Sequence, residues 1–145
     1  MRQRILIVDG HSMIFQWAEL AAQHGKNGAA ARQSLIRMLE SLQDGGDWHV
    51  VVVFDGKGTK TSEAGEPHSI QVFYSKAGQT ADSVIERLVA KYAQLYDVTV
   101  ATDDGMERTT VESFGALTMS SRQLRDDIDA AGRELSERLR QLKRR

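Results

Sequence analysis

Aspartates stand at the ends of three apolar runs in this sequence, and they are the residues best suited to chemistry. Asp9 and Asp55 each follow one run, and Asp103 and Asp104 follow a third. Carboxylates brought within a few ångströms of one another repel, so several ionised aspartates in one pocket need a compensating cation. Mg²⁺ and Mn²⁺ prefer oxygen ligands. The pattern therefore predicts a divalent-metal pocket in which the ion orients a water and stabilises charge on a phosphate.

A fourth acid comes from a segment with helical spacing. Asp82 falls in the first turn of a helix expected to start near Thr80, and Glu86 lies one turn further along the same face. Asp82 can complete the pocket, or it can stabilise the positive N-terminal end of its helix. Glu86 can face the pocket or be a surface partner of neighbouring cations.

Hydrophobic periodicity predicts the elements that position these acids. Helices are expected from near Asn27 to before Gly45, from Thr80, and from Ser120 or Ser121 onward. Short β-branched and apolar runs predict strands at residues 5–8, 49–54, 70–74, 98–101 and 117–119. This alternation implies right-handed crossovers and a three-layer α/β/α sandwich with a central, mainly parallel sheet. Such sheets bind ligands beyond the carboxyl ends of their strands, where the strand-end aspartates fall.

Composition excludes several other classes of site. The 145 residues include no cysteine, so disulfides, thiolate metal sites and a cysteine nucleophile are excluded. The four histidines show no paired metal-binding spacing. The first apolar run ends at Val8, which is too short for a signal-peptide core or for a membrane span of roughly 20 residues. We therefore expect a cytoplasmic protein that makes no membrane contact.

The C-terminal end is basic although the net charge of the chain is −1. Residues 133–145 hold six basic and two acidic side chains. We expect one domain over residues 1–130, followed by a basic helix end or tail over residues 131–145. The basic residues can attract phosphates, or they can be the solvated end of a helix whose dipole favours cations.

Other motifs give weaker indications. Residues 56–67 are predicted to form an irregular loop, whose glycines and lysines lack the GxxxxGK[ST] spacing of a phosphate-binding loop. The GxSxG element of serine hydrolases is also absent. Aromatic residues that lie in or beside core elements can stack on bases but usually serve packing. This group consists of Trp17, Trp48, Phe73 and Tyr74.

Five blocks together resemble the NYN-domain proteins of the YacP-like type, which are relatives of PIN-domain nucleases. The blocks are ILIVDGHS at residues 5–12, Ala31-Arg32, VVVFDG at residues 51–56, GQTADSVIE at residues 78–86 and VATDD at residues 100–104. The resemblance covers roughly residues 4–130. It implies a PIN-like fold, Mg²⁺- or Mn²⁺-dependent endoribonuclease activity and, for the characterised bacterial type, association with ribosomes and cleavage of messenger RNA.

The resemblance also implies roles for individual residues. Its acidic pocket, which holds the metal and carries catalysis, falls on Asp9, Asp55, Asp82 and Asp104. Arg32 corresponds to a phosphate contact, and it can equally be a surface or ion-pair residue.

Two positions depart from the family pattern, and one lysine adds to it. Ser12 stands where the family has an asparagine, and its shorter hydroxyl can still bind substrate through a water. Asp103 adds a carboxylate beside Asp104, so one or both can face the metal. Lys76 is a further candidate for binding the RNA backbone.

The leading hypothesis is a metal-dependent endoribonuclease. Its expected substrate is RNA, and ribosome-bound messenger RNA is one such substrate. A second is a noncatalytic RNA- or ribosome-binding module on the same scaffold, to which the changes at Ser12 and Asp103 point. A third is a receiver-like phosphoacceptor, which also gathers aspartates around Mg²⁺ but needs a lysine after a late strand. The segment after the last expected strand reads Ser120-Ser121-Arg122, without that lysine.

Overall fold

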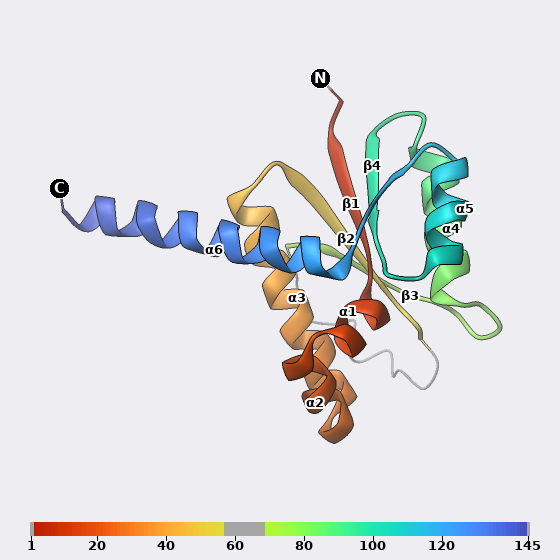
Figure 1. Ribbon diagram of the computed structural model, residues 1–145, viewed down its shortest axis with the longest axis horizontal. Helices are drawn as coiled ribbons and strands as arrows, with labels where there is room; N and C mark the ends of the chain where they lie inside the picture. Colours follow the sequence, from red (N-terminus) through yellow and green to blue (C-terminus); the bar gives the residue numbers. More distant parts are fainter. Residues whose placement is uncertain (1, 57–68, 145) are drawn as a thin grey trace.

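The computed structural model describes residues 2–56 and 69–144 and contains a five-stranded parallel sheet (Figure 1). The strands lie in the order β3-β2-β1-β4-β5, and every neighbouring pair is parallel. Their bounds are β1 (Arg4–Asp9), β2 (Trp48–Phe54), β3 (Gln71–Tyr74), β4 (Asp97–Ala101) and β5 (Leu117–Met119). The predicted α/β fold and the positions of all five expected strands are confirmed.

Within the described residues, six helices cover the two faces of this sheet. Three of them were expected: α3 (Gly28–Gly45), α4 (Ala81–Tyr92) and α6 (Ser121–Lys143). Each starts at a side-chain cap, supplied by Asn27, Thr80 and Ser120 respectively, which accepts a hydrogen bond from a backbone N–H of the first turn. The other three are short, namely α1 (Gly10–Gln16), α2 (Ala18–Lys26) and α5 (Gly105–Ser113), and their apolar residues are too few to show a helical period.

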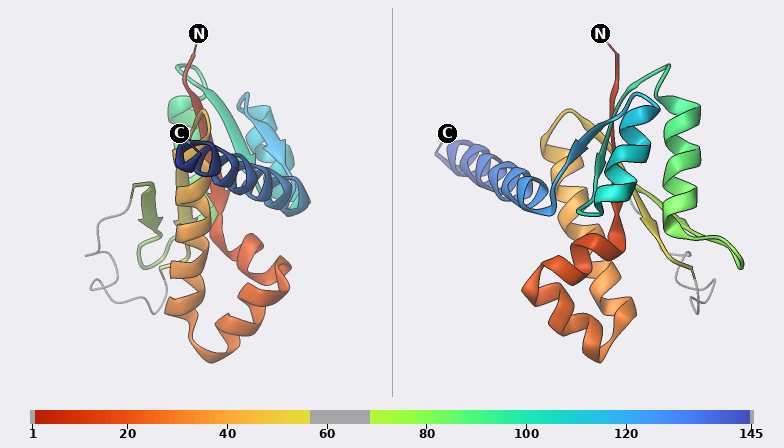
Figure 2. Two further views of the ribbon diagram at one scale, coloured as in Figure 1. Left: turned by 90° about the vertical axis from the view of Figure 1, so that its left-hand side faces the viewer. Right: turned by 45° about the vertical axis from the view of Figure 1, so that its right-hand side comes forward.

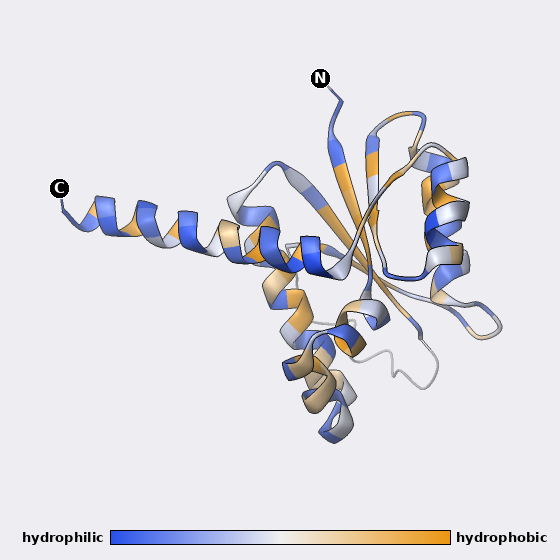
Figure 3. Cartoon of the chain, viewed as in Figure 1, coloured by the Kyte–Doolittle hydropathy of each residue, from blue (hydrophilic) through white to orange (hydrophobic). Residues whose placement is uncertain are grey.

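Alternation along the strands divides the core into two layers. On β1, Leu6 and Val8 pack in the layer covered by α1, α2, α3 and α6, whereas Ile5 and Ile7 pack in the layer covered by α4 and α5 (Figures 1 and 2). Because β1 pairs with β2 on one side and with β4 on the other, it is the buried centre of the sheet. The inner parts of the central strands β1 and β2 are therefore mostly orange, the hydrophobic colour, in Figure 3.

The helix α6 starts on the sheet and continues away from it (Figures 1 and 2). Its first turns bury Leu124 and Ile128, whereas Leu135 and Leu139 are exposed. The helix passes residue 130 without a break, so the expected basic segment over 131–145 is the outer part of α6 as far as Lys143.

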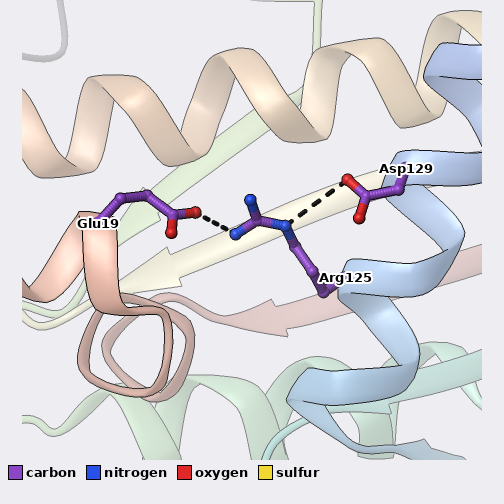
Figure 4. A network of polar contacts seen from close by, with 3 residues as sticks. All are labelled: Glu19, Arg125 and Asp129. Atoms are coloured by element: carbon purple, nitrogen blue, oxygen red, sulfur yellow. Dashed lines mark hydrogen bonds and ion pairs between the residues drawn. The ribbon is translucent and has the colours of Figure 1, made fainter.

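One arginine joins α2 to α6 at the surface of the molecule. Arg125 pairs with Glu19 of α2 and with Asp129 one turn along α6, 3.6 Å from Nε to Oδ1 (Figure 4). The hydrogen bond from Arg125 lowers the pKa of the Glu19 carboxyl. The guanidinium also lies 5.2 Å from the centre of the Trp17 ring, so this aromatic residue serves packing.

Two further sequence expectations bear on the fold. No helix within residues 2–56 and 69–144 is long and apolar enough to cross a bilayer. The irregular loop expected over residues 56–67 lies outside the described residues except for Gly56.

The junction of β1 and α1 requires glycine at position 10. A Cβ there would overlap the ring of Phe54, which is fully buried, and would lie 3.0 Å from the carbonyl oxygen of Val53. We expect Gly10→Ala to lower the free energy of unfolding by about 1–3 kcal/mol, because the ring or the helix must move. Urea denaturation followed by circular dichroism measures this change.

Gly25→Ala in α2 is the matched control, because a Cβ at Gly25 meets nothing within 4 Å. This variant should be neutral or more stable by up to about 1 kcal/mol, as expected for alanine in a helix. Equal losses in the two variants would contradict a steric requirement at Gly10.

Candidate metal centre

Asp9 is fixed at the end of the central strand and is only 6% exposed. Its Oδ1 accepts a hydrogen bond from the backbone N–H of Ser12 at 3.5 Å, which caps α1. Its Oδ2 accepts hydrogen bonds from the hydroxyls of Ser12 at 2.9 Å and Thr102 at 3.3 Å. These donors come from a helix and from the neighbouring strand end, so they hold the carboxylate in one orientation.

The two aspartates that follow β4 lie in different surroundings. The carboxylate of Asp104 caps α5 by accepting hydrogen bonds from the backbone N–H groups of Met106 at 2.9 Å and Glu107 at 3.3 Å. The carboxylate of Asp103 accepts hydrogen bonds from the backbone N–H and the hydroxyl of Ser121, at 2.8 and 2.6 Å. Asp103 is therefore bonded to the start of α6, whereas Asp104 belongs to the side of the sheet on which α5 lies.

Glu107 is a further acid that the sequence reasoning did not identify. It lies in the first turn of α5 and is 3% exposed, and neither of its buried carboxylate oxygens accepts a hydrogen bond from a donor group within residues 2–56 and 69–144. One carboxylate oxygen each from Glu107, Asp9 and Asp82 lie within 4.8 Å of one another. We call these three residues the acidic trio.

Crowding and burial change the ionisation of Glu107. The pKa of its carboxyl is raised to about 10, first by desolvation and then by the neighbouring carboxylates of Asp82 and Asp9. Such a group needs either a proton or a cation. Three oxygen donors without thiolate or imidazole suit Mg²⁺ or Mn²⁺, so the residues present fit the predicted metal.

A cavity of about 370 Å³ is lined by two members of the acidic trio, Asp9 and Asp82, whereas Glu107 is not among its lining residues. All four aspartates predicted from the sequence line it, so the topology brings them to one place. The lining residues are Asp9, His11, Ser12, Phe15, Gln16, Asp55, Thr80, Ala81, Asp82 and Asp104. Asp55 accepts a hydrogen bond from the Ser75 hydroxyl at 3.3 Å. Asp55 and Asp104 thus border the cavity without being members of the trio.

The predicted substrate-binding residues are spread more widely. Ser12 lies in the cavity but donates its hydroxyl to Asp9. Lys76 is exposed and lines an adjoining cavity of about 550 Å³, which shares Asp55 with the first. Arg32 is half-buried on α3 and does not line either cavity, and the same holds for Glu86 on α4.

A local signal for Glu107 is present in the sequence. Asp104 and Glu107 have the spacing of a helix N-cap and the acid three residues later that often accompanies it. That signal predicts a helix start at α5. It does not predict that Glu107 points back toward Asp9 and Asp82, which depends on how α5 packs against α4.

Comparison with known proteins agrees with the family resemblance of the sequence blocks. A model of the YacP-like NYN domain matches residues 6–145. The uncharacterized protein YacP of Bacillus subtilis (strain 168) is 31% identical over 140 residues, which cover 95% of this chain and 82% of YacP.

Solved structures of the Bacillus subtilis protein Rae1 (YacP) are also similar. One crystal structure has a TM-score of 0.82 and 32% identity, covering 95% of this chain and 80% of that one. A crystal structure of a Rae1 mutant has a TM-score of 0.85 and 30% identity, covering 97% of this chain and 84% of that one.

The raised pKa of Glu107 predicts how stability varies with pH when no metal is bound. Folding favours the protonated carboxyl, so its contribution is complete below the ordinary pKa of 4.5 and is lost as the pH rises toward about 10. In EDTA at neutral pH, Glu107→Gln should raise the free energy of unfolding by roughly 1–3 kcal/mol and flatten its fall with pH. Thermal denaturation from pH 5 to pH 9 measures both effects.

The same variant tests metal binding. MgCl₂ or MnCl₂ should raise the melting temperature of the unchanged protein, and this rise should be mostly lost in Glu107→Gln. Glu86→Gln is the matched control, because it removes an acid of α4 outside the trio and should keep the full metal-dependent rise. Equal metal-dependent stabilisation in both variants would rule out Glu107 as a ligand.

Asp103→Ala separates helix capping from metal binding. Losing both hydrogen bonds to Ser121 should lower the free energy of unfolding by about 0.5–2 kcal/mol. The increase in melting temperature on adding Mn²⁺ should remain. If the variant instead loses the response to Mn²⁺ while keeping its stability in EDTA, Asp103 is a metal ligand, as the sequence first suggested.

Proposed function

This chain belongs to the family of YacP-like NYN domains, which are PIN-like nucleases, and we propose that it is a divalent-metal-dependent endoribonuclease. The observation that carries the proposal is the buried Glu107 carboxylate. Neither of its oxygens accepts a hydrogen bond from a donor group of the described residues, and it lies against Asp9 and Asp82, two acids that line the cavity. Burial of that much like charge destabilises a fold unless a proton or a cation neutralises it, and in the proposed working protein a divalent cation does so.

Each acidic residue has a proposed role in this reaction. Asp9, Asp82 and Glu107 would hold Mg²⁺ or Mn²⁺, which supplies positive charge for the scissile phosphate and acidifies water. Asp55 and Asp104 border the same cavity and would orient the attacking water or a second ion. Ser12 and Thr102 act through Asp9, because their hydroxyls fix its carboxylate.

Cations further from the trio would bind the RNA backbone. Lys76 lines the adjoining cavity beside Asp55, and it can meet a phosphate next to the one that is cut. Arg32 on α3 and the basic residues of outer α6 extend the attraction by charge. The family resemblance supports RNA as the substrate, with messenger RNA on the cytoplasmic ribosome as its specific form.

A noncatalytic RNA- or ribosome-binding module is the second candidate function. The observation in its favour is the hydrogen bond that turns the Ser12 hydroxyl toward Asp9, at the position where the family has an asparagine. A hydroxyl that is donated to Asp9 does not take the place of the asparagine at the pocket, which favours loss of turnover over loss of binding. The receiver-like alternative has no support, because Ser120, Ser121 and Arg122 follow β5 and no lysine stands there.

Cleavage assays on the trio test the proposed activity. Purified protein incubated with single-stranded and structured RNAs should cleave them in Mg²⁺ or Mn²⁺ and not in EDTA. Asp9→Asn and Glu107→Gln should each lower kcat/KM by at least about 100-fold, because each removes a charged ligand while keeping the shape of the side chain.

Asp97→Asn is the control, because Asp97 is an exposed aspartate at the far end of β4. It should cleave at the rate of the unchanged protein. Cleavage that is indifferent to Asp9→Asn and Glu107→Gln would place the active site elsewhere. Cosedimentation with ribosomes but no cleavage in either metal would favour the noncatalytic module.

A further inference from the structure

Phe15 is an exposed aromatic residue at the acidic cavity. Its exposed fraction is 58%, although a phenylalanine usually gains stability by burial. It lines the same cavity as Asp9, Asp55 and Asp82. Exposure of one apolar ring is common by itself, but this ring stands at a cavity lined by carboxylates, where it is accessible to whatever enters.

Neighbouring rings hold Phe15 in place. His11 lies one turn earlier on α1, and its ring is nearly parallel to that of Phe15, with 17° between the planes and 6.0 Å between the centroids. His11 in turn meets the fully buried Phe54 edge to face at 6.4 Å. His24 of α2 meets Phe15 edge to face at 5.1 Å. The exposed ring is therefore supported from the core, and little freedom remains to be lost when a ligand binds.

We propose that Phe15, supported by His11, is a stacking platform for an unpaired base of single-stranded RNA next to the phosphate that enters the acidic cavity. This inference rests on the proposed function, because it names the substrate class of that same site. Aromatic rings bind the faces of bases, and these faces are accessible only in single-stranded or splayed nucleotides.

Charge and size agree with this assignment. The acids lining the cavity repel a nucleotide's phosphate until a cation neutralises them, whereas a neutral ring attracts its base whether or not metal is present. The cavity volume of about 370 Å³ lies at the lower end of the range for small-ligand pockets. One nucleotide, with its base on Phe15 and its phosphate over the trio, suits such a space.

Fluorescence of 2-aminopurine, which is quenched when this base analogue stacks, tests the platform directly. Single-stranded RNA oligonucleotides of about 12 residues, each carrying 2-aminopurine at a different position, are mixed with the full chain in Mg²⁺. Quenching is read by stopped flow, ahead of cleavage. We expect the unchanged protein to quench strongly at one position of its footprint and Phe15→Ala to lose that signal.

The affinity for single-stranded RNA should depend on Phe15 in the same way as the quenching. Phe15→Ala should bind the RNA roughly 5- to 100-fold more weakly, and Phe15→Trp should restore binding. With an abasic nucleotide at the quenched position, the unchanged protein and Phe15→Ala should bind equally. Phe114→Ala is the matched control, because Phe114 is also an exposed phenylalanine, at 47%, and does not line the cavity. It should bind and quench like the unchanged protein.

The outcomes separate this inference from the proposed activity. Position-specific quenching that depends on Phe15, without any cleavage, would keep the platform and overturn the nuclease. Metal-dependent cleavage with identical quenching and affinity in Phe15→Ala would keep the nuclease and overturn the platform. Failure of the unchanged protein to bind single-stranded RNA in Mg²⁺ or Mn²⁺, or equally tight binding of duplex RNA, would also overturn the platform.

Discussion

Repulsion among the carboxylates of Asp9, Asp82 and Glu107 is the constraint on which the functional end of this molecule depends. One oxygen from each lies within 4.8 Å of the others, and no donor group of the described residues gives a hydrogen bond to Glu107 that would offset its burial. An arrangement of this kind opposes folding when it is empty and gains stability when a divalent cation binds. The rest of the fold has to hold the three groups together against that repulsion.

The fold holds the three acids together by placing each of them at the end of a strand or at the start of a helix. Asp9 ends the central strand, which is paired on both sides, and Asp82 and Glu107 each lie in the first turn of a helix. The partial positive charge at a helix N-terminus offsets part of the negative charge there. Asp9 and Asp104 also cap helices themselves, so the hydrogen bonds that start α1 and α5 orient carboxylates of the cavity.

The helix α1 connects the acidic floor of the cavity to its aromatic rim. Gly10 allows the helix to begin against the Phe54 ring. The Ser12 hydroxyl donates a hydrogen bond to Asp9. His11 and Phe15 lie one turn apart on one face of the helix. The seven residues of α1 thus carry both the hydroxyl that fixes the Asp9 carboxylate and the ring proposed to stack on a base. Acidic groups suit the cation that a phosphate needs, and a neutral ring suits the base, so the two surfaces divide the recognition of one nucleotide.

Local patterns in the chain are enough to predict the sheet, its parallel arrangement and the edge at which Asp9, Asp55 and Asp104 gather, because buried strands have a local pattern and their carboxyl ends share an edge. Helical spacing and the family resemblance together predict the place of Asp82. The inward position of Glu107 against Asp9 and Asp82 follows from packing alone, and so does the difference between Asp103, which bonds to α6, and Asp104, which lines the cavity. The positions of these acids depend on how α5 packs against α4 and how α6 packs against α3. Such contacts join residues that are distant in the chain, so no local pattern encodes them.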